Sequence, residues 1–581
     1  MSVYLTPGVY RQPQPVEKLG VRLVRTDVAG FVGFAERGPL PPPEATLDQA
    51  REAAVRLTSW NQYRAIFGGF VPYGYLAYAV RAFFDNGGST CYVVRVAALK
   101  QAKPASKEEA GFVATARSAG SWGNRINLTI TPLKPREFSL RVSLMPGPDP
   151  SAPNEEEYYN RLSVEEGPFF VVDRVNDFSN LVTLSAQAIP QQAAWIQSLE
   201  QYEARQGGVR EQQEQQDILN VPRVVWLEAG HDGQHDLAIE DFTGGADDWR
   251  GLRILEEIDE VSILCAPDAV FERPSSTCAL SKELLAQRHT KTLHELTQIP
   301  GTFDGDAESL AKEPRSVQLD EDSALRIYRA MIDQCERLRD RIAILDYPRG
   351  KNDFVDLLDW KTKLVTRFGA IYYPWLRVQN PLRGEGDTRR VPAVGHVAGV
   401  YARIDNQFGV YRPPANAALE FVTDVTDKVT DLGQQRLNPY GINTIRAFSN
   451  RGIRVWGARS LADLDDTDWR YIHARRLMCM IEESVGKSTR WAVFEPNDFT
   501  LRQTLVHSLS VFLGAIWRNG GLKGSLPSDG FYVKCDETNN PPAVVDAGQL
   551  ICEVGVAVAE PMEFLVFQIH QSPGAAEIAE S

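Results

Sequence analysis

Residues 28–35 have the sequence VAGFVGFA, an uninterrupted apolar stretch that a Gly-Pro turn follows. Such a stretch predicts a buried β-strand. Residues 75–84, YLAYAVRAFF, place apolar side chains at helical spacing and predict an α-helix, which the Asn-Gly-Gly sequence at 86–88 ends. The next stretch, TCYVVRV at 90–96, again predicts a strand. The order strand, helix, strand favours a layered α/β domain.

The C-terminal third of the chain has a different pattern, in which long helices precede short strands. Apolar residues at spacings of three and four predict helices at 468–485 and 499–518. We expect a capping box of Thr500 and Gln503 to begin the second helix. Strands are predicted at 550–558 and 563–569, followed by a tail of small and polar residues. These elements favour an α+β domain.

The stretch 101–340 differs in composition from the N-terminal α/β region and from the C-terminal third. It is rich in proline turns, acidic residues and glutamine. We expect it to be a peripheral insertion. Within it, residues 261–265 predict a buried strand, and an apolar stripe over 325–338 predicts a helix. That helix runs into a predicted strand at 342–345, so the α/β core resumes there.

With 581 residues, the chain exceeds what one hydrophobic core supports, and several domains are expected. The predicted fold is a multidomain α/β protein: a layered α/β core with a C-terminal α+β domain, extended arms at both termini and a peripheral insertion. The expected parts are an N-terminal arm (1–20), the first part of the core (21–100), the insertion (101–340), the second part of the core (341–450), the C-terminal domain (451–560), and a C-terminal arm and tail (561–581).

The chain carries 62 Lys and Arg residues against 76 Asp and Glu residues, a formal net charge of −14. This acidic balance disfavours phosphate backbones, so no nucleic-acid partner is expected. The first residues lack the regions of a signal peptide, and no apolar run is long enough for a membrane helix. We therefore expect a protein made in the cytosol, without direct membrane insertion. The seven cysteines include no C-x-x-C pair and are expected to be reduced core residues.

Two short sequences resemble ligand-binding loops, but each fits a structural role better. The Gly-Lys-Ser sequence at 486–488 resembles the end of a phosphate-binding loop, yet Ile481 stands where that loop needs glycine, and a helix precedes the sequence. A helix C-terminal turn is expected instead. Residues 463–467 resemble the start of a calcium loop, but the required glycine and glutamate are absent. Their carboxylates are expected to cap the helix that starts near Trp469.

Neither a metal site nor a catalytic centre is expected. His231, His235 and Glu240 have a spacing that metal sites use, but they lie in a glycine-interrupted loop, where a surface turn is the simpler interpretation. No serine stands in a G-x-S-x-G sequence, and no histidine lies in a glycine-rich catalytic turn. The sequence therefore offers no nucleophile motif for a hydrolase.

From residue 370 onward the sequence contains a series of blocks rich in glycine, proline and aromatic residues. They are YYPWLRV (372–378), VPAVGHVAGVYAR (391–403), PPAN (413–416), LNPYGIN (437–443), GIRVWGAR (452–459), FEPND (494–498) and FYVKCD (531–536), with YLTPGVY (4–10) and GFAERGP (33–39) near the N-terminus. In this order the blocks resemble the contractile tail-sheath family of phage tails and contractile injection systems. The resemblance is strong over 1–100 and 340–570. No block concentrates an acid, a base and a nucleophile.

The resemblance implies a structural subunit that is not an enzyme and needs no cofactor. Such subunits form stacked hexameric rings of a helical sheath, which surrounds an inner tube and contracts to drive it through a target membrane. The implied partners are further copies of the chain, the inner tube protein, the baseplate, and tail-terminator or cap proteins. Assembly in the bacterial cytoplasm is implied, followed by incorporation into a phage tail or an injection particle. Of these two, the N-terminal blocks favour the injection particle. The alternatives are a specialised sheath paralogue at the cap or baseplate end, and an α/β hydrolase.

The resemblance also implies how subunits join. Strand-prone segments near both termini are expected to add strands to the C-terminal sheets of neighbouring subunits, unless they complete the sheet of their own domain. The arm residues are Val3, Tyr4, Leu5, Val9, Tyr10, Phe564, Leu565, Val566, Phe567 and Ile569. The polar side of helix 499–518 is expected to contact the inner tube, unless it is only the solvated face of a core helix. The candidate contacts are Arg502, His507, Arg518 and Lys523.

Overall fold

The computed structural model describes residues 20–109, 112–134, 137–149, 155–163, 166–186, 223–234, 237–245, 248–270, 320–383, 386–561, 563, 567–572 and 575–580. These residues form two compact units. The central unit comprises Thr26–Gln407 and Pro414–Ile472, and the C-terminal unit comprises residues 20–25, Phe408–Pro413 and the described residues from His473 onward. The predicted arm residues Val3, Tyr4, Leu5, Val9, Tyr10, Phe564, Leu565 and Val566 lie outside the described residues.

A nine-stranded sheet forms the core of the central unit, with the order β16-β19-β18-β13-β12-β11-β1-β3-β2. The strands from β18 to β3 in this order are parallel, and antiparallel strands complete both edges. The bounds are β1 (Ala29–Gly33), β2 (Ala54–Leu57), β3 (Cys91–Arg95), β11 (Ile263–Cys265), β12 (Ile342–Asp346), β13 (Gly369–Tyr373), β16 (Ala417–Ala418), β18 (Ile442–Phe448) and β19 (Gly452–Trp456). Every residue of β1, β11, β12 and β13 is buried, which explains their continuous apolar sequences.

Helices cover both faces of this sheet. Neighbouring residues of a strand point to opposite faces: Phe31 contacts Phe83 of α3, with ring centroids 5.6 Å apart, whereas Gly30 faces Leu255 of α8. The helix α11 packs against α8, and its Tyr328 contacts Trp360 of α12. The helices of the central unit around this sheet are α1 (Leu47–Ala53), α2 (Trp60–Phe67), α3 (Leu76–Asp85), α7 (Ile239–Thr243), α8 (Leu252–Glu256), α11 (Glu321–Leu338), α12 (Phe354–Thr362), α13 (Val394–Phe408) and α14 (Asp431–Leu437). The predicted strand–helix–strand unit and the helix over 325–338 are thereby confirmed.

Two glycines bring the helices α3 and α13 into close contact. A Cβ atom added at Gly395 would lie 2.3 Å from the carbonyl oxygen of Ala79, and one added at Gly399 would lie 2.6 Å from that of Phe83. Because these residues are four apart, both lie on one face of α13. The GHVAG sequence of the resemblance block is therefore a helix-packing surface.

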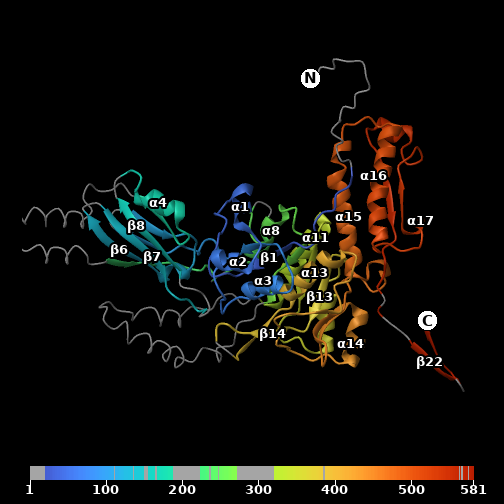
Figure 1. The fold of residues 1–581 in the computed structure, drawn as a ribbon, viewed down its shortest axis with the longest axis horizontal. Helices are drawn as coiled ribbons and strands as arrows, with labels where there is room; N and C mark the ends of the chain where they lie inside the picture. The colour runs from blue at the N-terminus through green and yellow to red at the C-terminus, as the bar shows by residue number, and fades with distance from the viewer. Residues whose placement is uncertain are drawn as a thin grey trace, which may run out of the picture. The chain divides into compact units, whose positions relative to one another are not determined.

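The described residues between 105 and 227 form a separate core within the central unit. Figure 1 shows its sheet strands β6, β7 and β8 beside α4. The bounds are β4 (Ser106–Glu109), β5 (Phe112–Ala116), β6 (Ile126–Lys134), β7 (Glu137–Leu144), β8 (Glu155–Ser163), α4 (Val171–Phe178), β9 (Val182–Ala186) and β10 (Arg223–Trp226), arranged as a four-stranded sheet β10-β6-β7-β8 and a three-stranded sheet β4-β5-β9. Their apolar side chains pack around Trp122 and Phe138.

The two ends of this module lie side by side. The amide of Ala98 donates to the carbonyl of Gly233 at 2.7 Å, and the amide of Lys103 donates to the carbonyl of His231 at 3.0 Å. The chain therefore enters and leaves the module through neighbouring backbone segments. A second small sheet of the central unit, β15-β14-β17, consists of β14 (Leu376–Gln379), β15 (Thr388–Val391) and β17 (Asp424–Val425).

The C-terminal unit consists of two long helices and a β-hairpin. Figure 1 shows α15 (Ile472–Ser488) beside α16 (Phe499–Arg518). Their apolar faces share one core with the hairpin β20 (Phe531–Lys534) and β21 (Glu553–Val556). Short helices α17 (Pro527–Gly530) and α18 (Pro542–Asp546) flank β20. A second hairpin comprises β22 (Phe567–Ser572) and β23 (Ala575–Glu580). Among the described residues, no helix combines the length and the apolar character needed to cross a membrane.

The close contact of α13 with α3 generates a prediction. We expect Gly395→Ala to lower the free energy of unfolding by about 1–3 kcal/mol, because the added methyl group meets the backbone of Ala79. In Gly514→Ala, on α16, the added Cβ has only Phe531 nearby, at 3.7 Å, so the better helix propensity of alanine is expected to raise stability by up to about 1 kcal/mol. Urea unfolding of both variants checks this, and equal stability would contradict the packing described.

Candidate functional site

The helix α16 carries the predicted contacts with the inner tube. Its N-cap fixes the residue at which it begins. The carboxylate of Asp498 accepts a hydrogen bond from the amide of Leu501 at 2.7 Å, so Asp498 is the N-cap. The predicted capping box of Thr500 and Gln503 is wrong, because Thr500 already lies inside the first turn. The predicted bounds of the helix are confirmed. Its buried side comprises Leu501, Leu505, Leu509, Phe512, Leu513 and Ile516.

The side of α16 that faces away from this core carries a stripe of four residues. His507, Val511, Gly514 and Arg518 follow one another at spacings of four, three and four, which places them on one helix face. His507 and Arg518 are exposed, and Val511 is 55% exposed. Among the described residues, neither His507 nor Arg518 has an ion-pair partner. We call these four residues the α16 stripe.

The other two predicted contacts do not belong to this stripe. Arg502 is half-buried and donates to the side-chain oxygen of Asn497 at 2.8 Å, so it holds the start of the helix. At 100° per residue, Arg502 lies about 140° around the helix from His507. Lys523 lies beyond the helix and pairs with Glu560 at 2.6 Å. The structure therefore brings together only His507 and Arg518.

The start of the described chain runs along α15. The amide of Arg22 donates to the hydroxyl of Ser488 at 3.0 Å, and the amide of Val24 donates to that of Ser484 at 3.1 Å. Val21 and Val24 pack against the core of the C-terminal unit. The segment that leads to the predicted N-terminal arm is therefore attached to this unit.

The C-terminal arm has more structure than its sequence suggested. The predicted tail of small residues contains β23, which pairs antiparallel with β22; Phe567 lies opposite Glu580, and Ile569 lies opposite Ile578. This pair is a sheet by itself, distinct from the β20-β21 hairpin. Among the described residues, β20 and β21 pair only with each other, so each has an outer edge available for another strand.

The motif-like sequences occupy structural positions. Residues 486–488 form the last turn of α15, as predicted, and Lys487 pairs with Glu483. The carboxylate of Asp463 accepts from the next amide, and the short helix η5 (Thr467–Trp469) has no side-chain cap, so the predicted capping role is wrong. His231 accepts from the amide of Gly233 at 3.2 Å. His235 is outside the described residues, within which no three His, Cys, Asp or Glu side chains cluster to hold a metal ion.

The position at which doubly wound α/β folds bind ligands is filled by the chain itself. The strand order reverses between β1 and β11, and ligands of such folds bind beyond the carboxyl ends of those strands. There the buried carboxylate of Asp268 accepts from the amides of Phe34 at 2.7 Å and Tyr75 at 2.5 Å. The donors that would bind a ligand are therefore occupied. Burial raises the pKa of Asp268 to about 7.

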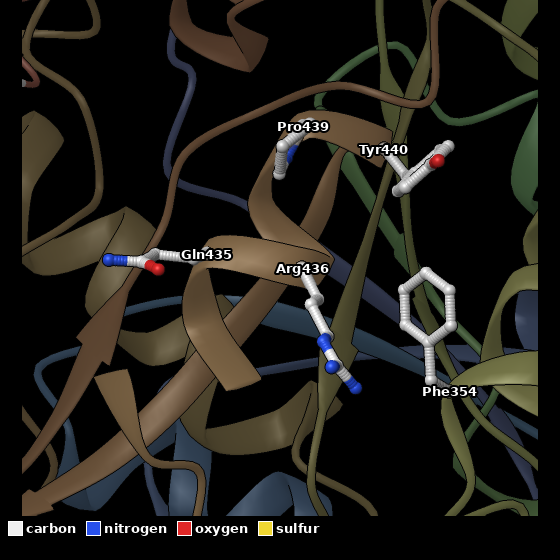
Figure 2. A pocket seen from close by; sticks show the side chains of 5 residues that line it. All are labelled: Phe354, Gln435, Arg436, Pro439 and Tyr440. Atoms are coloured by element: carbon white, nitrogen blue, oxygen red, sulfur yellow. The ribbon is translucent and has the colours of Figure 1, made fainter. Parts of the chain in front are cut away.

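A shallow cavity of about 360 Å³ lies beside α14, shown in Figure 2. Its lining consists of Phe354, Gln435, Arg436, Pro439 and Tyr440. The rings of Phe354 and Tyr440 meet edge to face, with centroids 5.9 Å apart. Tyr440 alone among these side chains can act as a general acid or base, so the lining supplies no acid–base pair.

Comparison with known proteins identifies two domains of the chain. Residues 317–461 match the phage tail sheath protein central domain, and residues 465–572 match the phage tail sheath C-terminal domain. The tail sheath protein of Vibrio phage KVP40 is 26% identical over 195 residues, which are 33% of this chain and 28% of that relative. The chain spans less than half the length of this relative and of two other phage tail sheath proteins that it matches.

The fold is similar to solved sheath structures over nearly the whole chain. The sheath complex of an extracellular contractile injection system, PVC, in its contracted state has a TM-score of 0.54 at 20% identity, covering 99% of each chain. A chain of the anti-feeding prophage baseplate in its contracted state has a TM-score of 0.54 at 17% identity, covering 99% of this chain and 100% of that one. The fold is that of contractile sheath proteins. Two adjacent parts of the chain, in this order, therefore match the central and C-terminal domains of phage tail sheath proteins.

The buried carboxylate of Asp268 generates a prediction about pH. Its folded pKa of about 7 lies above the ordinary value of 3.8, so between these values the folded chain binds a proton that the unfolded chain lacks. Stability is therefore expected to fall by up to about 1.4 kcal/mol per pH unit as pH rises toward 7, and then to level off. Asp268→Asn is expected to make this slope shallower.

Thermal unfolding of the full chain between pH 5 and pH 8 checks this expectation. Asp320→Asn is the matched control, because Asp320 is an exposed N-cap whose pKa is lowered by its hydrogen bonds to Ser323. The stability that the ionised Asp320 contributes is lost only as pH falls below this range. An Asp268→Asn slope equal to that of the unmodified chain would contradict the raised pKa.

Proposed function

We propose that this chain is the subunit of a helical contractile sheath that surrounds an inner tube and contracts to drive the tube through a target membrane. The observation that carries the proposal is the match of two adjacent domains to tail sheath domains on a fold shared with contracted sheaths. The occupied strand ends at Asp268 and the cavity lining without acid–base groups support a structural role rather than catalysis. The chain is therefore proposed not to be an enzyme and to need no cofactor.

Contraction in such a sheath draws its energy from two packings of the same subunits. Rigid bodies that meet at discrete interfaces switch between arrangements without being continuously deformed. The central unit fits this requirement, because its sheet is buried on both faces and its helices meet backbone to backbone at Gly395 and Gly399. The contacts that change are then those between subunits.

A connection between subunits that persists during contraction is proposed to use backbone hydrogen bonds. The outer edges of β20 and β21 can each accept an added strand. With about one net kcal/mol per hydrogen bond, an edge of this length binds an extended arm by a few kcal/mol before side-chain burial is counted. Segments 1–20 and 561–581 supply the arms. Because β22 and β23 pair with each other and not with β20 or β21, this hairpin is proposed to serve a neighbour.

The partners follow from this arrangement. Further copies of the chain form the sheath, the baseplate begins it, a cap or terminator ends it, and the inner tube lies inside. Assembly in the bacterial cytoplasm precedes incorporation into a phage tail or an injection particle. The similarity to a baseplate chain favours one second candidate, a sheath paralogue at the baseplate end of the particle. Electron microscopy separates the two, because a main sheath subunit forms long striated cylinders.

Deletion of residues 1–20 tests the exchanged arm. The shortened chain is expected to remain a folded monomer that forms no sheath, because the described core of both units lies outside the deleted segment. Circular dichroism checks folding, and negative-stain microscopy checks assembly. The unmodified chain, purified in parallel, is the control. Cylinders formed by the shortened chain, or its failure to fold, would show that the arm does not join subunits.

The α16 stripe tests the contact with the tube. His507→Glu combined with Arg518→Glu is expected to weaken binding to a tube that presents carboxylates, while the subunit stays folded. Each exposed contact is weak, so the loss becomes large only when many copies bind together. Arg436→Glu, an exposed arginine of the central unit, is the control for a charge reversal. Cosedimentation with assembled tubes measures the effect, and equal binding by both variants would exclude the stripe.

A further inference from the structure

Two cysteines face each other where the strands of the β20-β21 hairpin end. In the antiparallel register, Lys534 lies opposite Glu553. The next pair along the hairpin is therefore Cys535 and Cys552. Directly opposite residues of an antiparallel pair have Cα atoms about 4.5–5.5 Å apart, which is within the range that a disulfide bond spans.

The side chains of this pair point the same way. Phe531 and Val533 of β20 face the core of the C-terminal unit, and so do Val554 and Val556 of β21. Side chains alternate along a strand, so Cys535 and Cys552 continue the core-facing side of the hairpin. Both cysteines are free, and each thiol lies near enough to the other to affect its pKa.

A buried amide fixes the backbone on both sides of the pair. The side chain of Asn540 is 2% exposed. It accepts from the amide of Ile551 at 2.7 Å and donates to the carbonyl of Ile551 at 2.8 Å and to that of Asp536 at 3.1 Å. Asp536 follows Cys535, and Ile551 precedes Cys552. Asn540 thus ties together the two backbone segments that carry the cysteines.

We propose that Cys535 and Cys552 are a disulfide-forming site, oxidised by small-molecule disulfides such as oxidised glutathione. The half-exposed Cys552 attacks first: its thiolate forms a mixed disulfide and releases one glutathione thiolate. The thiolate of Cys535 then attacks the Cys552 sulfur and releases the second. Two protein thiols and one glutathione disulfide become one protein disulfide and two glutathione thiols, with the two protein protons passing to the released thiolates. This inference concerns the isolated chain and does not rest on the sheath function.

The chemistry of the pair sets when the bond forms. Burial raises the pKa of both thiols, that of Cys552 to about 12. Thiolates are therefore scarce at neutral pH, and oxidation is slow in a reducing cytosol. The rate is expected to increase about tenfold per pH unit between pH 7 and pH 9. Once formed, the bond closes the loop between the strands and stabilises the hairpin.

Peptide mapping of the full chain tests the site. The folded protein is incubated with oxidised glutathione at pH 8, remaining thiols are blocked with N-ethylmaleimide, and the chain is digested without reductant by a protease that cleaves after glutamate. Cleavage at Glu537 separates the two cysteines, so a disulfide appears as one linked pair of peptides. The expected result is a link between Cys535 and Cys552 that reductant removes.

Controls within the chain make the test decisive. Cys91 and Cys265 lie in strands on opposite sides of β1, about two strand spacings apart, and are expected to stay unlinked. Cys552→Ser is expected to lose the linked peptides, and also the upward shift of several degrees in unfolding temperature that oxidation gives the unmodified chain. Labelling of both Cys535 and Cys552 by N-ethylmaleimide after oxidation, a lasting glutathione adduct on Cys552, or a link to another cysteine would overturn the proposal.

Discussion

Two buried carboxylates at the ends of neighbouring strands fix where the helices α3 and α13 of the central unit begin. The first amides of a helix have no partner within it, and in a buried position they need an acceptor. Asp268, just beyond β11, supplies one to the start of α3, and Asp346, at the end of β12, supplies one to Ala393 and Val394 at the start of α13. With both starts fixed on the sheet, the glycine face of α13 meets α3. Burial raises the pKa of Asp346, like that of Asp268, to about 7.

The same contacts occupy the position at which doubly wound α/β folds bind ligands. A ligand anion beyond the ends of β1 and β11 would need the amides that Asp268 already uses. Among the described residues, a side chain of the protein itself therefore fills the place that a ligand takes in such folds.

Local patterns predicted the elements whose apolar residues are buried. The stretch 28–35 and helix 499–518 could be predicted because apolar periodicity reports burial directly. The role of Asp268 could not, since it depends on β1, β11 and α3 meeting in space, and its sequence neighbours carry no sign of it. The different roles of Arg502 and His507 could not be predicted either. Both are polar residues of one helix, but only the structure shows that Arg502 donates a hydrogen bond to Asn497. β23 was missed because its alanine-rich sequence has weak strand propensity.

The module at 105–227 has its own core, and its two ends are joined by backbone hydrogen bonds from Ala98 and Lys103 to residues 231–233. A segment that starts and finishes at one place exerts no strain on its host when its length or content changes. Both matching tail sheath domains begin after it, at residues 317 and 465. The module can therefore be replaced or enlarged without altering the nine-stranded sheet from which it extends.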